Sequence, residues 1–339
     1  MRENSKNRNY KSLQFNKIFI TGGAGYVGSA LVPRLLERGH EVTVYDLFLY
    51  EDTLGDHPKL KKIRGDIRNR DLLLESAKMH DAFIHLACIS NDPSFDLDPE
   101  LGKSINYDAF FNVLDSAKLN NVKRLIYASS ASVYGIKKEK NVNEEATLEP
   151  ITDYAKYKAE CEKILSEESG DMEYVILRPA TLCGYAPRLR LDLSVNILTI
   201  NALVNRKIKV FGGNQFRPNL NIKDMVRAYE LALDSPEDII NKGVFNVGYQ
   251  NLTIMQIANA VKEVLGDKSI EIEIVPTDDK RSYHINSDKI KRILGFKFKY
   301  GVEDAVKSLL NAFNDGLISD GLNNPFYHNI KRMKEVNLN

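Results

Sequence analysis

The residues best suited to chemistry are Tyr154 and Lys158, which form a Tyr-x-x-x-Lys pair. Residues four apart share one face of a helix, so the ammonium can lie beside the phenol. A phenol with a pKa near 10 is a poor base at neutral pH, and a neighbouring positive charge favours its phenolate. The serine run 129–132 lies upstream, and the Ser130 hydroxyl can orient a substrate oxygen. The pattern indicates a tyrosine base acting on an alcohol, although the spacing alone also occurs in surface helix pairs.

A second signal is a glycine-rich turn near the start of the chain. Glycines at positions 22, 25 and 28 follow a short apolar segment and precede an apolar-periodic one. Glycine permits a tight turn and lets backbone N–H groups approach a pyrophosphate at a helix N-terminus. The alternative is a turn that only packs the helix on the strand. The expected phosphate-binding residues are Gly22, Gly25, Tyr26, Val27 and Gly28.

A carboxylate follows the next apolar segment, where Asp46 comes directly after residues 41–45. At the end of the second strand of a dinucleotide-binding unit, a carboxylate accepts hydrogen bonds from the adenosine ribose and repels a 2′-phosphate. The sequence therefore predicts NAD rather than NADP.

Alternating strand and helix patterns position these residues. Such alternation predicts a Rossmann-type doubly wound parallel sheet with helices on both faces. The strands are expected at 17–21, 41–45, 61–65, 82–86, 124–128 and 174–177, and the helices at 26–38, 71–77, 101–119 and 154–166. Beyond residue 179 the expected elements are helices 192–204, 224–233 and 254–265 and strands 207–211 and 244–247.

Composition excludes several classes of function. The formal net charge is +1, and no basic run is interleaved with aromatic residues, so nucleic acid is not an expected partner. No apolar stretch approaches the ~20 residues that span a bilayer. The three cysteines show neither metal-ligand nor disulfide spacing. We expect no metal, no membrane partner and a cytoplasmic location.

These motifs together resemble the extended short-chain dehydrogenase/reductases, and within them the nucleotide-sugar epimerases and dehydratases. The resemblance runs from about residue 17 to about residue 312. It implies an enzyme whose partner is a nucleotide-diphosphate sugar. The resemblance also implies that NAD is contacted by Tyr154 and Lys158 and by a further set of residues: Asp66, Ile67, Leu86, Ala87, Cys88, Asn106 and Ala180. It implies diphosphate contacts from Arg217 and Arg281, because planar guanidinium groups suit phosphate oxygens; the alternative for both is surface ion pairing.

Two positions after the active serine narrow the reaction. Dehydratases and decarboxylases of this group place acidic residues there, and 3,5-epimerases place a cysteine, whereas this chain has Ala131 and Ser132. Ser130 and Ser132 are then expected to contact the substrate. The pattern is most similar to 4-epimerases, which act through a 4-keto intermediate without consuming NAD. The alternatives are a 4-dehydrogenase that releases the ketone and a non-catalytic NAD-bound sensor.

The segment 178–192 departs from ordinary UDP-galactose 4-epimerases. It resembles a branch that modifies sugars of surface polysaccharides. Arg188, Arg190 and Asn196 are expected sugar or diphosphate contacts, and the alternative for the two arginines is a solvated basic turn.

The resemblance also implies a division of the chain and an assembly. The expected NAD-binding domain is 17–180 plus roughly 221–249, and the smaller, interwoven C-terminal nucleotide-sugar domain is 181–220 and 250–322. Residues 1–16 are expected to form a flexible extension, and the tail from 323 shows little periodicity. Helices 101–119 and 154–166 are expected to pair in a homodimer, with Phe110, Phe111 and Leu114 as surplus apolar surface.

Overall fold

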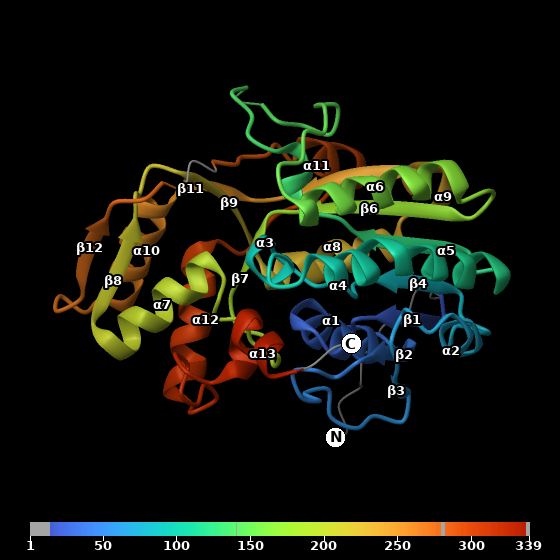
Figure 1. The fold of residues 1–339 in the computed structure, drawn as a ribbon, viewed down its shortest axis with the longest axis horizontal. Coiled ribbons are helices and arrows are strands. Elements are labelled where there is room, and N and C mark those ends of the chain that lie inside the picture. The colour runs from blue at the N-terminus through green and yellow to red at the C-terminus, as the bar shows by residue number, and fades with distance from the viewer. Residues whose placement is uncertain (1–13, 140, 279–281, 337–339) are drawn as a thin grey trace, which may run out of the picture.

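A seven-stranded, all-parallel sheet organises the larger lobe of the computed structural model, which describes residues 14–139, 141–278 and 282–336. The strand order is β10-β6-β5-β4-β1-β2-β3 (Figure 1). Its strands are short and largely buried, as a sheet covered on both faces requires. The strands are β1 (Lys17–Thr21), β2 (Glu41–Asp46), β3 (Leu60–Arg64), β4 (Ala82–His85), β5 (Arg124–Ala128), β6 (Glu173–Pro179) and β10 (Gly243–Val247). The predicted doubly wound α/β class is confirmed.

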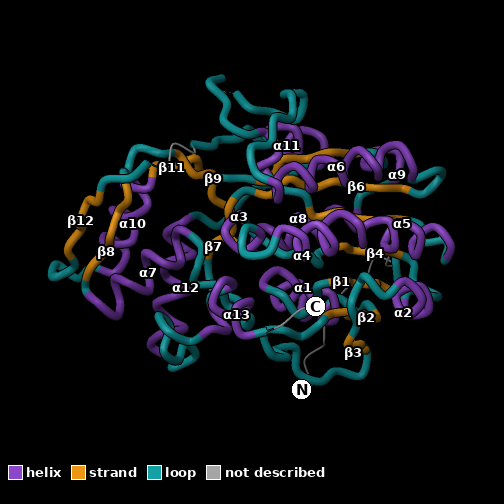
Figure 2. Tube along the Cα trace, viewed as in Figure 1, coloured by secondary structure: helices purple, strands orange, loops and turns teal. Residues whose placement is uncertain are grey.

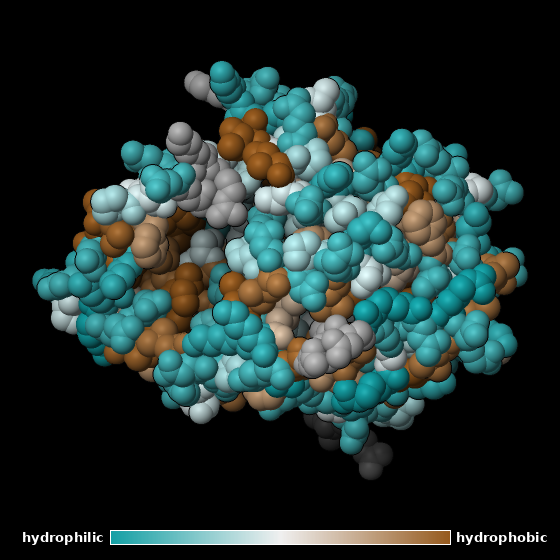
Figure 3. Space-filling view, viewed as in Figure 1, coloured by the Kyte–Doolittle hydropathy of each residue, from teal (hydrophilic) through white to brown (hydrophobic). Residues whose placement is uncertain are grey.

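Helices cover both faces of this sheet. One core contains α1 (Tyr26–Glu37) and α8 (Ile222–Asp234), and the other contains α2 (Arg70–Ser76), α5 (Ala109–Leu119) and α6 (Asp153–Glu168). Phe110 and Leu114, offered above as surplus apolar surface, are instead part of the second core. Phe111 remains exposed. Figure 3 shows one side of the molecule as largely hydrophilic, with hydrophobic residues in separate patches.

The expected single helix 101–119 is broken into three elements. Helix α4 (Pro99–Lys103) is followed by a π-helical turn at Ser104–Asp108 and then by α5. A π-helical turn often marks a functional site. The remaining short elements of this lobe are α3 (Asp92–Phe95), a 3₁₀ turn at Ala131–Tyr134, α9 (Glu237–Ile240) and α11 (Asp288–Leu294).

The second lobe combines two small sheets with three helices (Figure 2). Helices α7, α10 and α12 share a separate hydrophobic core with β8. The chain crosses between lobes more than once, because β10 pairs with β6 in the large sheet and β11 then pairs with β9 in a small one. The elements are β7 (Thr181–Cys183), α7 (Ser194–Asn205), β8 (Lys207–Phe211), β9 (Phe216–Asn221), β11 (Gln250–Thr253), α10 (Ile254–Leu265), β12 (Glu271–Val275) and α12 (Val302–Asn314).

Both ends of the described chain depart from expectation. Residues 1–13 of the expected flexible extension lie outside the described part of the chain. Phe15, in the same predicted segment, is buried, and the Arg124 guanidinium lies 5.0 Å from its ring centre. The tail is structured: a 3₁₀ turn at Pro325–Tyr327 leads into helix α13 (Asn329–Glu335). Within the part of the chain that the structure describes, no helix is long and apolar enough to cross a membrane.

Candidate active site

A cleft of about 510 Å³ lies at the carboxyl ends of the parallel strands, where a doubly wound sheet binds its ligands. Both lobes contribute to its walls. Most of the predicted site residues line it: Gly22, Gly25, Tyr26, Val27, Asp46, Asp66, Ile67, Leu86, Ala87, Cys88, Ser130, Ser132, Tyr154, Lys158, Ala180, Arg188, Arg190 and Arg217. The structure therefore gathers into one cavity residues that lie far apart in the sequence.

The glycine turn leaves backbone open to this cleft. Gly22 has φ +74°, and a Cβ there would lie 2.5 Å from the backbone nitrogen of Ala87. Gly25 is the N-cap of α1, so the first N–H groups of that helix face the cavity. Gly28 does not line the cavity; a Cβ there would lie 2.2 Å from the Gly23 carbonyl oxygen, so this glycine permits close packing of α1 on the turn that precedes it.

Asp46 is held at the mouth of the turn. Its carboxylate accepts hydrogen bonds from the backbone N–H of Ala24 at 3.0 Å and of Phe48 at 2.7 Å. Burial raises the pKa of Asp46, and the two backbone bonds oppose that rise. Each oxygen keeps a free lone pair that can accept a ribose hydroxyl.

Some of the other predicted cofactor contacts line the cavity, whereas Asn106 fixes a loop that forms part of its wall. Asp66 lines the cavity while its carboxylate receives the Arg68 guanidinium at 2.7 Å. Asn106 lies in the π-helical turn and does not line the cavity. Its amide bonds both the N–H and the carbonyl of Ile89, at 2.8 and 2.9 Å. Asn106 therefore fixes the loop after β4, whose residues Leu86 and Cys88 form the cavity wall.

Tyr154 and Lys158 lie on one face of α6, next to Ser130. The Lys158 ammonium lies 5.9 Å from the centre of the Tyr154 ring. Ser130 lines the cavity beside Tyr154, and its Oγ lies 2.8 Å from the Ser132 Oγ. Two hydroxyls and one phenol thus converge where a substrate alcohol could sit.

The electrostatics of Tyr154 differ from the simple expectation of a lowered pKa. Burial raises the pKa of Tyr154 and outweighs the opposing effects of the Arg190 charge and the Ser130 hydrogen bond. A buried phenol favours its neutral form unless further positive charge is brought close. Arg190 and Lys158 are cations near this phenol and favour its phenolate form.

A buried ion pair supports the catalytic helix from behind. Glu162, one turn after Lys158, receives the Arg178 guanidinium at 2.6 Å, and Ser129 donates to the same carboxylate. Arg178 also donates to the Tyr134 hydroxyl at 2.7 Å. Because Arg178 lies one residue before the end of β6 and Ser129 follows β5, this network fixes α6 against two strands of the sheet.

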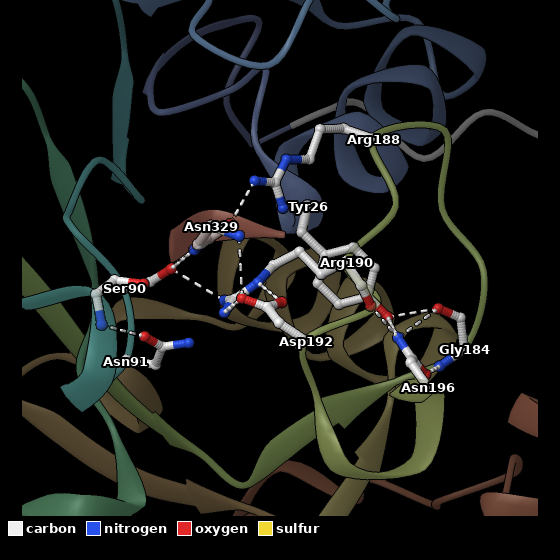
Figure 4. A network of polar contacts seen from close by, with 10 residues as sticks. Tyr26, Ser90, Asn91, Gly184, Arg188, Arg190, Asp192, Asn196 and Asn329 are labelled. Carbon is white, nitrogen blue, oxygen red and sulfur yellow. Dashed lines mark hydrogen bonds and ion pairs between the residues drawn. The ribbon is translucent and has the colours of Figure 1, made fainter. Parts of the chain in front are cut away.

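The loop after β7 is buried rather than solvated, so the basic-turn alternative is wrong. Arg190 pairs with Asp192 at 3.0 Å and donates to Ser90 Oγ at 2.9 Å (Figure 4). Burial alone would raise the pKa of Asp192, but Arg190 holds it below its usual range. Arg188 is 3% exposed and lies 3.6 Å from the Tyr50 ring centre.

Asn196 is not brought to the cavity. Its amide oxygen accepts from the Gly184 N–H at 2.9 Å, and its nitrogen donates to the Arg190 carbonyl at 2.7 Å. It is fully buried beside the Tyr26 hydroxyl. This corrects the expectation of a direct substrate contact: Asn196 shapes the loop that carries Arg190.

The two expected diphosphate arginines come from the second lobe. Arg217, on β9, lines the cavity with its guanidinium 5.7 Å from the Tyr283 ring centre. Arg281 lies outside the described residues.

Several cavity residues escaped the sequence analysis. Ser90 and Tyr50 lie in loops whose composition does not indicate a binding site. Asp192 was not predicted either, although its place two residues after Arg190 could have indicated it. Asn329 and Met333 come from α13, in the tail that lacks clear periodicity. Only the fold brings this tail back to the cleft.

The cleft fits NAD on the evidence of its own walls. Backbone N–H groups at the start of α1, a glycine with no room for a Cβ and the carboxylate that ends β2 lie along the same cavity as Tyr154. These are the features that a dinucleotide's pyrophosphate and ribose require.

Comparison with known proteins agrees with this geometry. A UDP-glucose 4-epimerase of Lactobacillus helveticus is 30% identical over 86% of this chain and 94% of its own. The structure of a UDP-glucose 4-epimerase of Thermotoga maritima with UDP-glucose superposes with a TM-score of 0.80 at 25% identity, covering 89% of this chain and 99% of that one. A UDP-N-acetylglucosamine 4-epimerase of Methanobrevibacter ruminantium M1, in complex with UDP-N-acetylmuramic acid, gives 0.78 at 27%, covering 87% and 98%.

The chain also matches a family as a whole. Residues 18–248 match the NAD dependent epimerase/dehydratase family, a span that includes the glycine turn, Asp46, the serine run and the Tyr154–Lys158 pair. The chain therefore belongs to the NAD-dependent epimerase/dehydratase family, as an enzyme whose cofactor is NAD.

Proposed function

We propose that this enzyme is a nucleotide-diphosphate-sugar 4-epimerase that acts through a 4-keto sugar. The observation that carries this proposal is the composition of the cavity wall beside Tyr154: Ser130 and Ser132 face the phenol, with Ala131 between them. The site thus holds a base for an alcohol and hydroxyls to orient it.

The chain's own residues divide the work at the sugar. Ser130 orients the 4-hydroxyl, and Tyr154 accepts its proton. Lys158 places a positive charge near the phenol, and the Arg190 charge opposes, without cancelling, the effect of the phenol's burial. NAD, when bound, supplies hydride transfer at C4. Tyr154 then returns the proton to the oxygen after the ketone has turned.

The same wall argues against the other reactions of the family. Expulsion of a 6-hydroxyl needs an acid near the substrate, and proton exchange at C3 or C5 needs an acid–base group of suitable pKa. Ala131 has no ionisable group and Ser132 is a hydroxyl bonded to Ser130. These two positions therefore supply neither group, and redox chemistry at C4 is the reaction that Tyr154 with Ser130 and Ser132 supports.

The choice between epimerase and 4-dehydrogenase rests on the relatives. The Lactobacillus helveticus and Thermotoga maritima proteins are both named UDP-glucose 4-epimerases. We therefore place the epimerase first and a UDP-hexose first among substrates. We further propose that the enzyme is a cytoplasmic homodimer. We also propose that it supplies sugars for a surface polysaccharide, because the loop 178–192 resembles the branch of the family that modifies such sugars.

A substrate panel tests this proposal. The purified protein is incubated with UDP-, GDP-, CDP- and dTDP-hexoses, and the products are identified by NMR. We expect one nucleotide series to give the C4 epimer with no net change in NADH. Stoichiometric NADH with a 4-keto sugar would support the dehydrogenase instead, and inertness toward every sugar would support the sensor.

A further inference from the structure

The C-terminal helix α13 lies across the cofactor side of the cleft. Asn329 and Met333 line the cavity. Arg332 Nε donates to the Leu49 carbonyl at 2.5 Å, three residues after the ribose-side carboxylate Asp46. Figure 1 shows α13 where the two lobes meet, and α13 contacts α3. The end of the chain therefore returns to the loops that flank the dinucleotide.

Asn329, at the start of this helix, joins two loops. Asn329 Nδ2 donates to Ser90 Oγ at 3.1 Å, and Asn329 Oδ1 accepts from Arg188 Nη2 at 2.6 Å (Figure 4). Its backbone N–H donates to Asp192 at 3.2 Å. Ser90 follows β4 in the large lobe, whereas Arg188 and Asp192 follow β7 in the second. Asn329 thus bridges the cleft.

Arg188 is a buried cation without a counter-ion in the described part of the chain. It is 3% exposed, and neither a carboxylate within ion-pair distance nor a hydrogen-bond partner for its Nε occurs among the described residues. Burial lowers the pKa of Arg188 to about 10. An uncompensated buried charge is unfavourable, so an anion placed beside this guanidinium would be bound strongly.

The position of Arg188 indicates which anion its guanidinium would bind. Its backbone N–H donates to Ser29 Oγ at 3.1 Å, and the Ser29 N–H bonds the Gly25 carbonyl at 2.8 Å in the first turn of α1. That turn is where a dinucleotide's pyrophosphate binds. The Asp46 carboxylate also acts electrostatically on Arg188. Arg188 therefore lies between the ribose side and the pyrophosphate side of the NAD site.

We propose that Arg188 and Asn329 form a clasp that retains NAD: Arg188 pairs with the cofactor's pyrophosphate, and Asn329 holds Arg188 in place and closes the cleft. This moves Arg188 from the substrate contacts expected above to the cofactor contacts. The inference depends on NAD binding and not on the outcome at C4. A clasp of this kind slows the exchange of a cofactor that must stay bound through a cycle.

Cofactor release tests the clasp directly. Full-length holoenzyme loaded with labelled NAD is diluted into excess unlabelled NAD, and retained label is followed in time. Removal of a charged hydrogen bond should accelerate release about 10- to 100-fold in Arg188→Gln and Asn329→Ala. Lys334→Ala, an exposed position on the same helix, should match the wild type. Unchanged release in both clasp variants would overturn the proposal.

Competition against labelled NAD locates the contact and guards against simple loosening of the fold. Arg188→Gln should weaken the binding of ADP by about 10- to 100-fold and change the affinity for adenosine by no more than about twofold. The ADP affinity of Arg188→Lys should lie between those of the wild type and Arg188→Gln. Equal losses of ADP and adenosine would show general damage and overturn the assignment. UDP binding to NAD-saturated protein should be unchanged; a loss confined to UDP would place Arg188 on the substrate's diphosphate instead.

Discussion

Lys158 Nζ donates a hydrogen bond of 2.6 Å to the backbone carbonyl of Ala128, the last residue of β5. This bond ties the catalytic helix α6 to the carboxyl end of a central strand. It holds the ammonium over the Tyr127 ring, 5.1 Å from its centre, and 5.9 Å from the centre of the Tyr154 ring. The position of the fixed charge beside the phenol therefore comes from the sheet.

The first prediction concerns the base. Tyr154→Phe should preserve the fold and NAD content but lower turnover about 10²- to 10⁴-fold, because general-base catalysis typically contributes that much. Steady-state kinetics with the substrate found in the nucleotide-sugar panel, together with the NAD content of the purified variant, measures this. Tyr157→Phe, three residues along the same helix, is the matched control. Near wild-type turnover in Tyr154→Phe would remove the tyrosine from the mechanism.

The second prediction concerns the choice of cofactor. Titration should show tighter binding of NAD(H) than of NADP(H), because the Asp46 carboxylate repels a 2′-phosphate. Asp46→Ala should narrow the preference by about tenfold or more, which corresponds to about 1.4 kcal/mol. Asp52→Ala, a more exposed carboxylate nearby, should leave the preference unchanged. Equal affinities in the wild-type protein would contradict this role for Asp46.

The third prediction concerns assembly. We expect a homodimer through α5 and α6, although Phe110 and Leu114 belong to the core and only Phe111, 38% exposed, remains of the three residues first considered. Phe111 packs edge-on against Tyr107, 5.9 Å between ring centres. Phe111→Lys should shift sedimentation toward the monomer, whereas Phe211→Lys, on β8 of the second lobe, should not. A wild-type protein that is monomeric at micromolar concentration would exclude this interface.

The fourth prediction concerns acid stability. Burial lowers the pKa of His85 to about 3 from 6.5, and its ring accepts or donates one bond, at 2.7 Å, with Thr21 Oγ1. Below pH 6.5 His85 becomes protonated in the unfolded chain but stays neutral in the folded chain. The free energy of unfolding should therefore fall as pH decreases from 6.5 toward 3, by about 1.4 kcal/mol per pH unit from this residue.

His85→Phe should remove that contribution. Urea unfolding at pH 7.5 and at pH 4.5 measures the difference between wild type and variant. Above pH 6.5 the two should show the same pH slope, and below it the wild type should be steeper. Parallel slopes below pH 6.5 would mean that His85 is protonated in the folded protein.

The sequence was most informative where local pattern and chemistry coincide. Strands β1 and β5 and helix α10 have the expected bounds, because short apolar runs and regular periodicity determine them locally. The glycine turn and the Tyr154–Lys158 pair were recognisable because their chemistry requires fixed spacing. Asp46 was recognisable because it ends a strand.

The remaining features depend on tertiary contacts that no local pattern reports. The π-helical turn at Ser104–Asp108 serves the Asn106 bonds to Ile89, which lie 17 residues away in the sequence. Helix α13 is seven residues long and is held by the bonds of Asn329 and Arg332 to distant loops. The burial of Arg188 likewise requires Tyr50 and Asn329, which are remote from it in the chain.

In the proposed reaction, chemistry occurs only at C4 and the ketone is reduced again before release. An incubation of the substrate deuterated at C4, with a parallel reaction of unlabelled substrate in heavy water, tests this when both are read by NMR. We expect that the C4 epimer keeps its deuterium at C4 and that no solvent deuterium appears on carbon. Solvent deuterium at C3 or C5, or loss of the C4 label to accumulating free NADH, would contradict it.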